Sequence, residues 1–213
     1  MGRRETFETI YREKLFGAVP GERFYSGNGS VGQFNDSYCE LVAQIIHEKG
    51  ITSIVDLGCG DFRIGRRLAA LVDDYVGVDI VPDLIEQNRK EYGSKHLSFA
   101  CLDIVEDPLP KGDLCLVRQV LQHLNNAEIS TVLSKLGIYR WALITENVSA
   151  GEVKCPNVDH VHGPETRLVE GSGVFLTEPP FSLGAAKTWE LPYDETSILL
   201  TVLIDTSNST VLK

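Results

Sequence analysis

Two glycines and two carboxylates stand where a small ligand could be held. The run IVDLGCGD, residues 54–61, is a short apolar strand that ends at Asp56 and is followed by Gly58 and Gly60. Glycines there let the backbone turn tightly and approach a ligand closely before a helix begins. About 20 residues further on, Asp79 ends a second apolar strand, where a carboxylate can accept hydrogen bonds from both hydroxyl groups of a ribose. The pattern predicts a nucleoside-containing ligand.

The spacing of the glycines excludes two common kinds of nucleotide-binding turn. A nicotinamide-binding fingerprint would have a third glycine at position 63, where this chain has Arg63. No Gly-Lys-Ser/Thr follows the turn, so a Walker loop is excluded as well. The alternative to a ligand site is a tight turn in an unrelated α/β protein beside a coincidental acid.

The turn resembles the first motif of the class I S-adenosylmethionine-dependent methyltransferases, which is an acidic residue, one spacer and Gly-x-Gly. The resemblance extends over residues 20–205 and implies S-adenosyl-L-methionine as the cofactor. It implies that Asp79 binds the ribose and that Asp103 accepts a hydrogen bond from the adenine amino group. The residues that it assigns to cofactor binding are Tyr25, Ser26, Gly27, Asp56, Gly58, Cys59, Gly60, Asp79, Ile80, Asp103, Ile104, Arg118, Gln119 and Val120.

Two further stretches fit a bacterial subgroup of this family that acts on small molecules. The stretch YSGNGS, residues 25–30, resembles a Ser-Gly-x-Gly-Ser segment that precedes the first motif in that subgroup, and Pro179-Pro180-Phe181 resembles a second segment. One residue departs from the family pattern, since Phe62 occupies a position where many members have a third glycine.

Two sets of residues are candidates for the acceptor side. His123 follows the fourth predicted strand and has an ordinary pKa near operating pH, so we predict it as a general base; the alternative is a helix cap or a packing residue. Asp159, His160 and His162 could bind the acceptor, supply a base at His160, hold a metal, or be solvated loop residues. Arg167 could clamp a carboxylate or phosphate on the acceptor, or lie on the surface. We predict no metal, because the candidate ligands are crowded into four residues without a fourth partner.

The elements that must position these residues alternate in type. Strands are predicted at 53–57, 75–79, 97–102, 114–117 and 141–145, with helices at 5–17, after the glycine turn to about residue 72, at 82–92 and from 125 to about 136. Strands that alternate with helices indicate a parallel sheet covered on both faces. Two more strands, 187–191 and 197–204, flank a turn and are predicted to form an antiparallel hairpin. The fold class is therefore α/β, a Rossmann-like doubly wound sheet of seven strands.

The predicted organisation is a single domain overall. Residues 1–50 form an N-terminal helical cap on the acceptor side, and residues 51–213 form the cofactor-binding core. Residues 147–184 are rich in glycine, proline and aspartate and are predicted to be a long substrate loop, since a connection of this length is commonly functional.

The composition of the chain limits the partners and the cellular compartment that we expect for this protein. The formal net charge of −10 repels phosphate backbones, so we expect no nucleic acid partner. No apolar run is long enough to span a membrane, and the charged N-terminus lacks the apolar core of a secretory signal. Five scattered cysteines without a CxxC pair favour a reducing compartment, so we predict a cytoplasmic protein. A homodimer formed through the N-terminal helices is an open alternative to a monomer.

These observations together predict an S-adenosylmethionine-dependent methyltransferase that acts on a small polar acceptor, a metabolite or sugar derivative. O-methylation is favoured over N-methylation. The alternative is a catalytically degenerate binding module of the same fold, which senses the cofactor or supports a partner enzyme.

Overall fold

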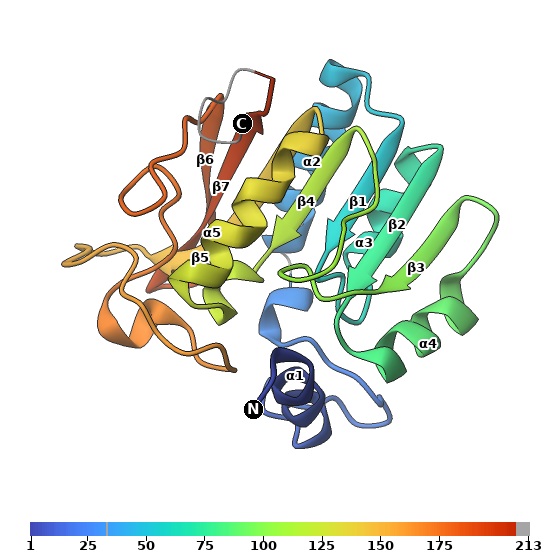
Figure 1. The fold of residues 1–213 in the computed structure, drawn as a ribbon, viewed down its shortest axis with the longest axis horizontal. Helices are drawn as coiled ribbons and strands as arrows, with labels where there is room; N and C mark the ends of the chain where they lie inside the picture. The colour runs from blue at the N-terminus through green and yellow to red at the C-terminus, as the bar shows by residue number, and fades with distance from the viewer. Residues whose placement is uncertain (33, 208–213) are drawn as a thin grey trace. The chain divides into compact units, whose positions relative to one another are not determined.

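A computed structural model describes residues 1–32 and 34–207. The chain falls into two compact units, Met1–Asp113 and Leu114–Lys213. The first unit contains a three-stranded parallel sheet and four α-helices. The second contains four strands and one α-helix (Figure 1).

The first unit is built on three parallel strands in the order β3-β2-β1. Its strands are β1 (Ser53–Leu57), β2 (Asp74–Asp79) and β3 (Leu97–Cys101), and its helices are α1 (Arg3–Arg12), α2 (Phe34–Lys49), α3 (Gly65–Leu68) and α4 (Pro82–Tyr92). Short 3-10 turns lie at Asn28–Ser30 and Ala69–Leu71. Four of the five β1 residues are buried, as expected for a parallel strand covered on both faces. Pro82 begins α4 at a position where its missing N–H costs nothing.

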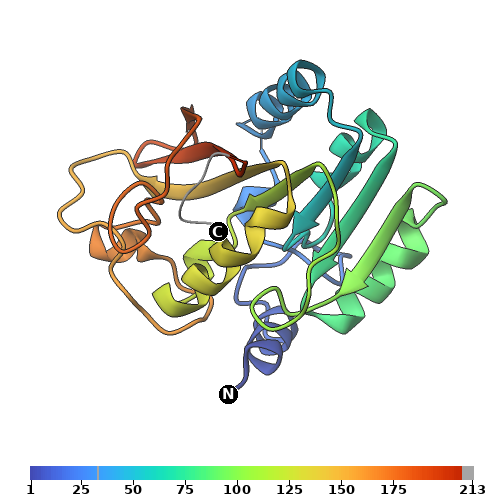
Figure 2. The same cartoon turned by 45° about the horizontal axis from the view of Figure 1, so that its top comes forward.

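The second unit pairs one parallel strand with an antiparallel hairpin. Its elements are β4 (Leu114–Arg118), a 3-10 helix η3 (Leu121–His123), α5 (Asn126–Lys135), a 3-10 turn (Leu136–Ile138), β5 (Trp141–Ser149), a 3-10 helix η5 (Arg167–Glu170), β6 (Lys187–Pro192) and β7 (Ser197–Asp205). Strand β4 is parallel to β5, whereas β7 is antiparallel to both β5 and β6. The predicted hairpin is confirmed, and Figure 2 shows it at the red end of the colour scale beside β5.

The predicted fold class is confirmed. The strand order is β3-β2-β1-β4-β5-β7-β6, of which the first unit supplies three strands and the second four. This is a Rossmann-like sheet of seven strands, mostly parallel, flanked by helices and ending in an antiparallel hairpin. None of the helices in the described part of the chain is both long and apolar enough to cross a membrane.

Three predicted elements differ from the structure by more than one residue. Helix α1 ends at Arg12 rather than at residue 17, because Lys14 takes a φ of 56° and breaks the helical run. The helix after the glycine turn is a four-residue α3 followed by a 3-10 turn. Strand β5 continues to Ser149, four residues past its predicted end, because all of Trp141–Ser149 pairs with β7.

The segment between β5 and β6, residues 150–186, contains most of the predicted long loop. It is folded within the second unit and is called the cover below. It contains η5 and buries four large apolar side chains, those of Val174, Leu176, Phe181 and Leu183. A Cβ atom at Gly173 would lie 2.7 Å from Val148, so the cover packs directly on β5. Its role as a substrate loop stays a prediction.

Candidate cofactor site

The backbone N–H groups of the glycine turn between β1 and α3 are hydrogen-bonded within the protein. The N–H groups of Gly58 and Cys59 both donate to the Val78 carbonyl, at 2.8 and 2.9 Å. The N–H of Gly60 donates to Asp79 Oδ2 at 3.1 Å, and the N–H of Asp61 donates to Ser26 Oγ at 2.7 Å. A turn that binds a pyrophosphate needs such N–H groups pointing at the ligand. This turn, from residue 58 to 61, uses them internally, and α3 is too short to add a strong helix N-terminus.

The two glycines of this turn are required by its geometry. Gly58 and Gly60 have φ values of 79° and 53°, which a residue with a Cβ atom adopts only at a cost. A Cβ atom on Gly60 would also lie 2.5 Å from Ser26 Oγ. The turn and the Asp79 carboxylate beside it form the predicted cradle for a ligand that approaches the backbone closely.

Asp79 carries the charge of this cradle. Its side chain ends β2 and the residue is 8% exposed. The carboxylate accepts hydrogen bonds from the N–H groups of Gly60 and Val81, both at 3.1 Å. Burial raises the pKa of Asp79 to about 6, against the lowering effect of these donors, so the group is mainly ionised at pH 7. A carboxylate has about four lone-pair sites, so it can still accept hydrogen bonds from a diol.

Asp56 and Cys59 lie at the same turn with different surroundings. Asp56 accepts a hydrogen bond from Tyr75 Oη at 2.8 Å and is buried. Burial raises the pKa of the Cys59 thiol well above its usual range, so this cysteine stays protonated. Asn88 of α4 donates to the Gly60 carbonyl at 2.8 Å and fixes the turn from the helix side.

The predicted adenine end is tied to the N-terminal helix. Both carboxylate oxygens of Asp103 accept from Arg3 Nε, at 3.2 and 3.0 Å, and Oδ1 also accepts from the Val105 N–H. Ile104 is buried and Ile80 is half-buried. Sequence reasoning missed Arg3, because nothing in its spacing connects it with a residue 100 positions away.

The early segment at residues 25–30 lies against the glycine turn. Ser26 donates its N–H to Asp61 Oδ2 at 3.0 Å and accepts from the Asp61 N–H, so the two residues are joined twice. Gly27 has a φ of 86°, and Tyr25 Oη donates to Asn28 Oδ1 at 2.8 Å. Tyr11 Oη shares a hydrogen bond of 2.9 Å with Ser26 Oγ. The structure thus brings the two predicted motifs together within the first unit.

Phe62 occupies the position where many methyltransferases with a similar turn have a third glycine. It adopts a φ of 61°, a strained value for an aromatic residue, and is fully buried. Its ring packs edge-on against Tyr75 and Phe99, with centroid distances of 5.6 and 4.7 Å. A Cβ atom at Gly65 would lie 2.3 Å from this ring. Aromatic packing over Gly65 offsets the backbone strain.

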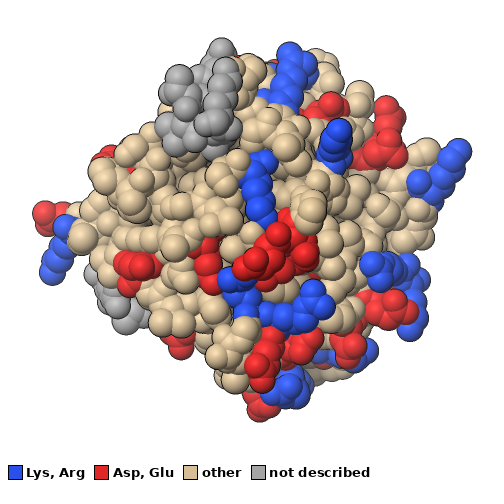
Figure 3. All heavy atoms as spheres, viewed as in Figure 1, with Lys and Arg blue, Asp and Glu red and all other residues tan. Residues whose placement is uncertain are grey.

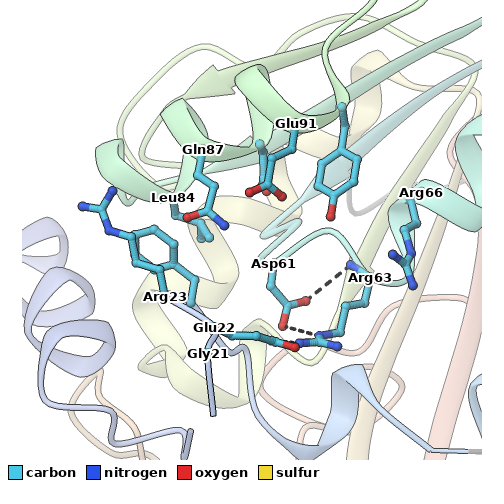
Figure 4. Close-up of a pocket in the computed structure, with 12 residues that line it drawn as sticks. Gly21, Glu22, Arg23, Asp61, Arg63, Arg66, Leu84, Gln87 and Glu91 are labelled. Carbon is cyan, nitrogen blue, oxygen red and sulfur yellow. Dashed lines mark hydrogen bonds and ion pairs between the residues drawn. The ribbon is translucent and has the colours of Figure 1, made fainter. Parts of the chain in front are cut away.

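A polar cavity of about 460 Å³ adjoins the turn within the first unit (Figure 4). Three guanidinium groups and three carboxylates line it, those of Arg23, Arg63, Arg66, Glu22, Asp61 and Glu91. Several of these charges already pair with one another, since Arg63 contacts both Asp61 and Glu22. None of the residues predicted to hold the cofactor lines this cavity, so it is distinct from the cradle at Asp79.

In the second unit, the segment after β4 carries the remaining predicted cofactor residues. Gln119 has a φ of 55° and donates its N–H to the Thr145 carbonyl at 2.7 Å. The Val120 N–H donates to Glu146 Oε1 at 3.1 Å. Arg118 is half-buried at the end of β4. Their contact with a cofactor stays a prediction.

His123 is held in one neutral form. Its Nδ1 lies 3.1 Å from the Gly163 carbonyl oxygen, which can only accept, so Nδ1 carries the proton and Nε2 accepts from the Gln122 amide at 3.3 Å. Burial lowers the pKa of His123 to about 4. A ring with this pKa is neutral at pH 7 and is a weak base, so the predicted base role would require a strongly activated acceptor.

The predicted acceptor residues of the cover are hydrogen-bonded to different groups of the protein. Asp159 Oδ1 accepts from the Asn126 N–H at 2.7 Å. His160 Nε2 donates to the Gln122 carbonyl at 3.0 Å, and His162 Nδ1 lies 2.9 Å from Glu128 Oε1. Among the described residues, no group of three or more His, Cys, Asp or Glu side chains is arranged to hold a metal ion. The alternative of solvated loop residues is wrong for the two histidines, which are half-buried and hydrogen-bonded.

Arg167 is buried, at 2% exposure, so its alternative placement on the surface is wrong. It donates to the carbonyl oxygens of Val158 and Leu124, both at 2.7 Å, and also to the carbonyl oxygens of Leu121 and Gln122. The guanidinium therefore fastens the cover to the segment after β4. Its contact with an acceptor stays a prediction.

Comparison with known proteins agrees with this geometry. A sequence profile of a family described as a methyltransferase domain matches residues 54–138, which contain the glycine turn and Asp79. This family model covers less than half of the chain. The malonyl-[acyl-carrier protein] O-methyltransferase of Acetivibrio thermocellus is 32% identical to it over 84 residues, which are 38% of this chain. That match spans only 30% of the length of the A. thermocellus enzyme.

Solved structures share the fold of this chain over most of its length. The N-methyltransferase NodS from Bradyrhizobium japonicum WM9, solved with S-adenosyl-L-homocysteine, has a TM-score of 0.63 at 15% identity, covering 91% of this chain and 97% of NodS. Magnesium protoporphyrin IX methyltransferase from Synechocystis PCC 6803, solved with S-adenosylmethionine, has a TM-score of 0.59 at 16% identity, covering 95% of this chain and 97% of that enzyme. At these identities the likeness concerns the fold.

Proposed function

We propose that this protein is an S-adenosylmethionine-dependent methyltransferase that acts on a small polar acceptor. The observation that carries the proposal is the combination at the glycine turn. Its backbone N–H groups are satisfied internally, while the Asp79 carboxylate keeps accepting capacity at the rim. Such a site suits a nucleoside without phosphates, and S-adenosylmethionine is one, whereas a nicotinamide dinucleotide is not.

In the proposed site, different residues of the first unit contact different parts of the cofactor. Asp79 would accept hydrogen bonds from the ribose hydroxyls, and Gly58 and Gly60 would admit the amino-acid part close to the backbone. Asp103 would accept from the adenine amino group with its remaining lone pairs, beside Ile104. S-adenosylmethionine, when bound, supplies an electrophilic methyl group on a sulfonium. The protein's task is then to align and desolvate the acceptor more than to supply a strong base.

For the acceptor, we propose an oxygen nucleophile of a small metabolite or sugar derivative. The matched stretch of an O-methyltransferase supports oxygen, while the fold is shared with an N-methyltransferase. On the face drawn in Figure 3, basic and acidic side chains are interleaved around α1, and the net charge of −10 disfavours nucleic acid. We further propose a cytoplasmic protein, with a homodimer as the alternative to a monomer.

Calorimetry with S-adenosyl-L-homocysteine tests cofactor binding without knowledge of the acceptor. We expect binding by the wild type and a loss of roughly tenfold or more in Asp79→Asn, because the neutral amide cannot accept from two hydroxyls and two N–H groups. Protonation of Asp79 should by itself weaken binding as the pH drops below about 6. The matched control is Asp113→Asn, a carboxylate of the first unit that accepts from the N–H groups of Thr52 and Ser53 at the start of β1. Absence of binding by the wild type would refute the proposal.

One observation favours a second candidate, the catalytically degenerate binding module. Three predicted acceptor residues are hydrogen-bonded to other groups of the protein, namely His160, His162 and Arg167. His123 is in addition a weak base. Under this alternative the protein binds S-adenosyl-L-homocysteine but transfers no methyl group from labelled S-adenosylmethionine to any component of a metabolite extract.

A further inference from the structure

Glu146 places a buried carboxylate beneath the segment that follows β4. The residue lies in β5 and is 1% exposed. Its Oε1 accepts from the N–H groups of Val120 and Leu121, at 3.1 and 2.9 Å, and its Oε2 accepts from the N–H of Gln122 at 3.1 Å. These are the first N–H groups of η3, which have no partner within the helix itself. One side chain thus fixes three consecutive backbone positions.

Arg167 holds the same segment through its carbonyl groups. Its guanidinium donates to the carbonyl oxygens of Leu121 and Gln122, at 3.3 and 3.2 Å, and to that of Leu124 at 2.7 Å. The N–H groups of residues 120–122 are therefore bound by a buried carboxylate, and the carbonyl groups of residues 121, 122 and 124 are bound by a buried cation. Pairing of this kind fixes a backbone conformation more tightly than either charge alone.

This arrangement is costly if stability is its only purpose. Burial raises the pKa of Glu146 to about 7, against the lowering effects of the three N–H groups and of Arg167. The folded protein therefore holds this proton more tightly than the unfolded chain, and the contribution of Glu146 to the free energy of unfolding falls as pH rises from 4.5 to about 7. A neutral residue at this position would avoid that loss.

A second observation indicates that the segment meets a ligand. Gln122 is 6% exposed, and its Oε1 has no hydrogen-bond partner among the described residues, although its amide nitrogen contacts His123. A buried amide oxygen without a donor costs stability, and a donor on a ligand would remove that cost.

We propose that Glu146 is a positioning residue: through the N–H groups of residues 120–122, its carboxylate holds the segment after β4 in the conformation that binds the cofactor. Arg167 is its counterpart at the carbonyl groups. The inference rests on the proposed function, because it assigns to this segment the contact with S-adenosylmethionine. Glu146 itself acts only through the backbone.

The test combines Glu146→Gln with a matched control, Asp113→Asn. Asp113 also accepts two backbone N–H groups, those of Thr52 and Ser53, but at the start of β1. In Glu146→Gln the new side-chain amide would point its NH₂ at one backbone N–H, so we expect roughly tenfold weaker binding of S-adenosyl-L-homocysteine at pH 8. Hydrogen exchange of the amides at 120–122 should accelerate by a similar factor. Asp113→Asn should change neither measurement.

The pH profile separates positioning from general stability. In the wild type, affinity for S-adenosyl-L-homocysteine should fall below a midpoint near 7; in Glu146→Gln the midpoint should move to about 6, the value expected from Asp79. Equal affinity and an identical profile in both proteins would overturn the inference while leaving the proposed function intact. A wild type that binds nothing at any pH would instead overturn the proposed function. The wild-type profile needs no substitution, so it tests the inference even if the variant folds poorly.

Discussion

Replacing Gly60 by alanine tests the geometry of the glycine turn. Two separate effects oppose the substitution. The φ of 53° lies in the left-handed region, and the new Cβ atom would lie 2.5 Å from Ser26 Oγ. Ser26 cannot give way without cost, because its hydroxyl holds both Tyr11 Oη and the Asp61 N–H.

The expected loss follows from these two effects. A residue with a Cβ atom in the left-handed region costs about 1 to 2 kcal/mol. Displacing Ser26 weakens two hydrogen bonds at about 1 kcal/mol each. The free energy of unfolding should therefore fall by about 3 to 4 kcal/mol, which for a chain of this size lowers the Tm by roughly 6 to 16 °C.

Thermal denaturation of three further variants separates the two effects. Gly50→Ala is the matched control, since Gly50 has a φ of 62° and an added Cβ atom meets nothing within 4 Å. It should lose only the backbone contribution of about 1 to 2 kcal/mol. Ser26→Ala alone should cost about 2 kcal/mol, and the double variant Ser26→Ala/Gly60→Ala should cost little more than Gly60→Ala, because both changes break the same contacts.

Two outcomes would refute this reasoning. If Gly60→Ala and Gly50→Ala unfold within about 1 °C of each other, the contact with Ser26 does not restrict the turn. If the double variant loses the full sum of the single losses, Ser26 and Gly60 are energetically independent and the two motifs are not coupled.

Two further predictions concern the second unit. Arg167→Met should lower the free energy of unfolding by about 3 to 5 kcal/mol, because several buried carbonyl groups lose this charged donor and Glu146 loses the positive charge that lowers its pKa; chemical denaturation measures this, and a loss below about 1 kcal/mol would contradict it. Asn125→Ala should cost about 1 kcal/mol, because the Asn125 side chain and Glu128 form a capping box at the start of α5; an unchanged Tm, with affinity for S-adenosyl-L-homocysteine also unchanged, would mean that the box contributes nothing.

The periodic and local features of this protein could be predicted from its sequence. The alternation of short apolar strands with helices predicts a parallel sheet, and the turn residues between 192 and 197 predict the closing hairpin; both are confirmed. The glycine turn and Asp79 share a strand edge because the carboxyl ends of parallel strands meet there. These signals are readable because they depend on residues close together in the chain.

The boundaries were harder to predict because they depend on single backbone conformations. Lys14 and Phe62 adopt positive φ values that their residue types disfavour. The end of α1 and the conformation of the glycine turn therefore cannot be predicted from residue preferences. Phe62 is held there by rings from β2 and β3, which lie 13 and 37 positions further along the chain.

What the sequence by itself determined is the class of the fold and the glycine turn at which a ligand is predicted, because periodicity and a glycine turn are local properties. Only the tertiary structure decided which charges are used by the protein itself. Arg3 meets Asp103, Glu146 meets the amides of 120–122, and Arg167 meets the carbonyls beside them, although long stretches of chain separate each pair. A buried charge takes its role from the partners that folding brings within about 3 Å, and sequence spacing does not encode those partners.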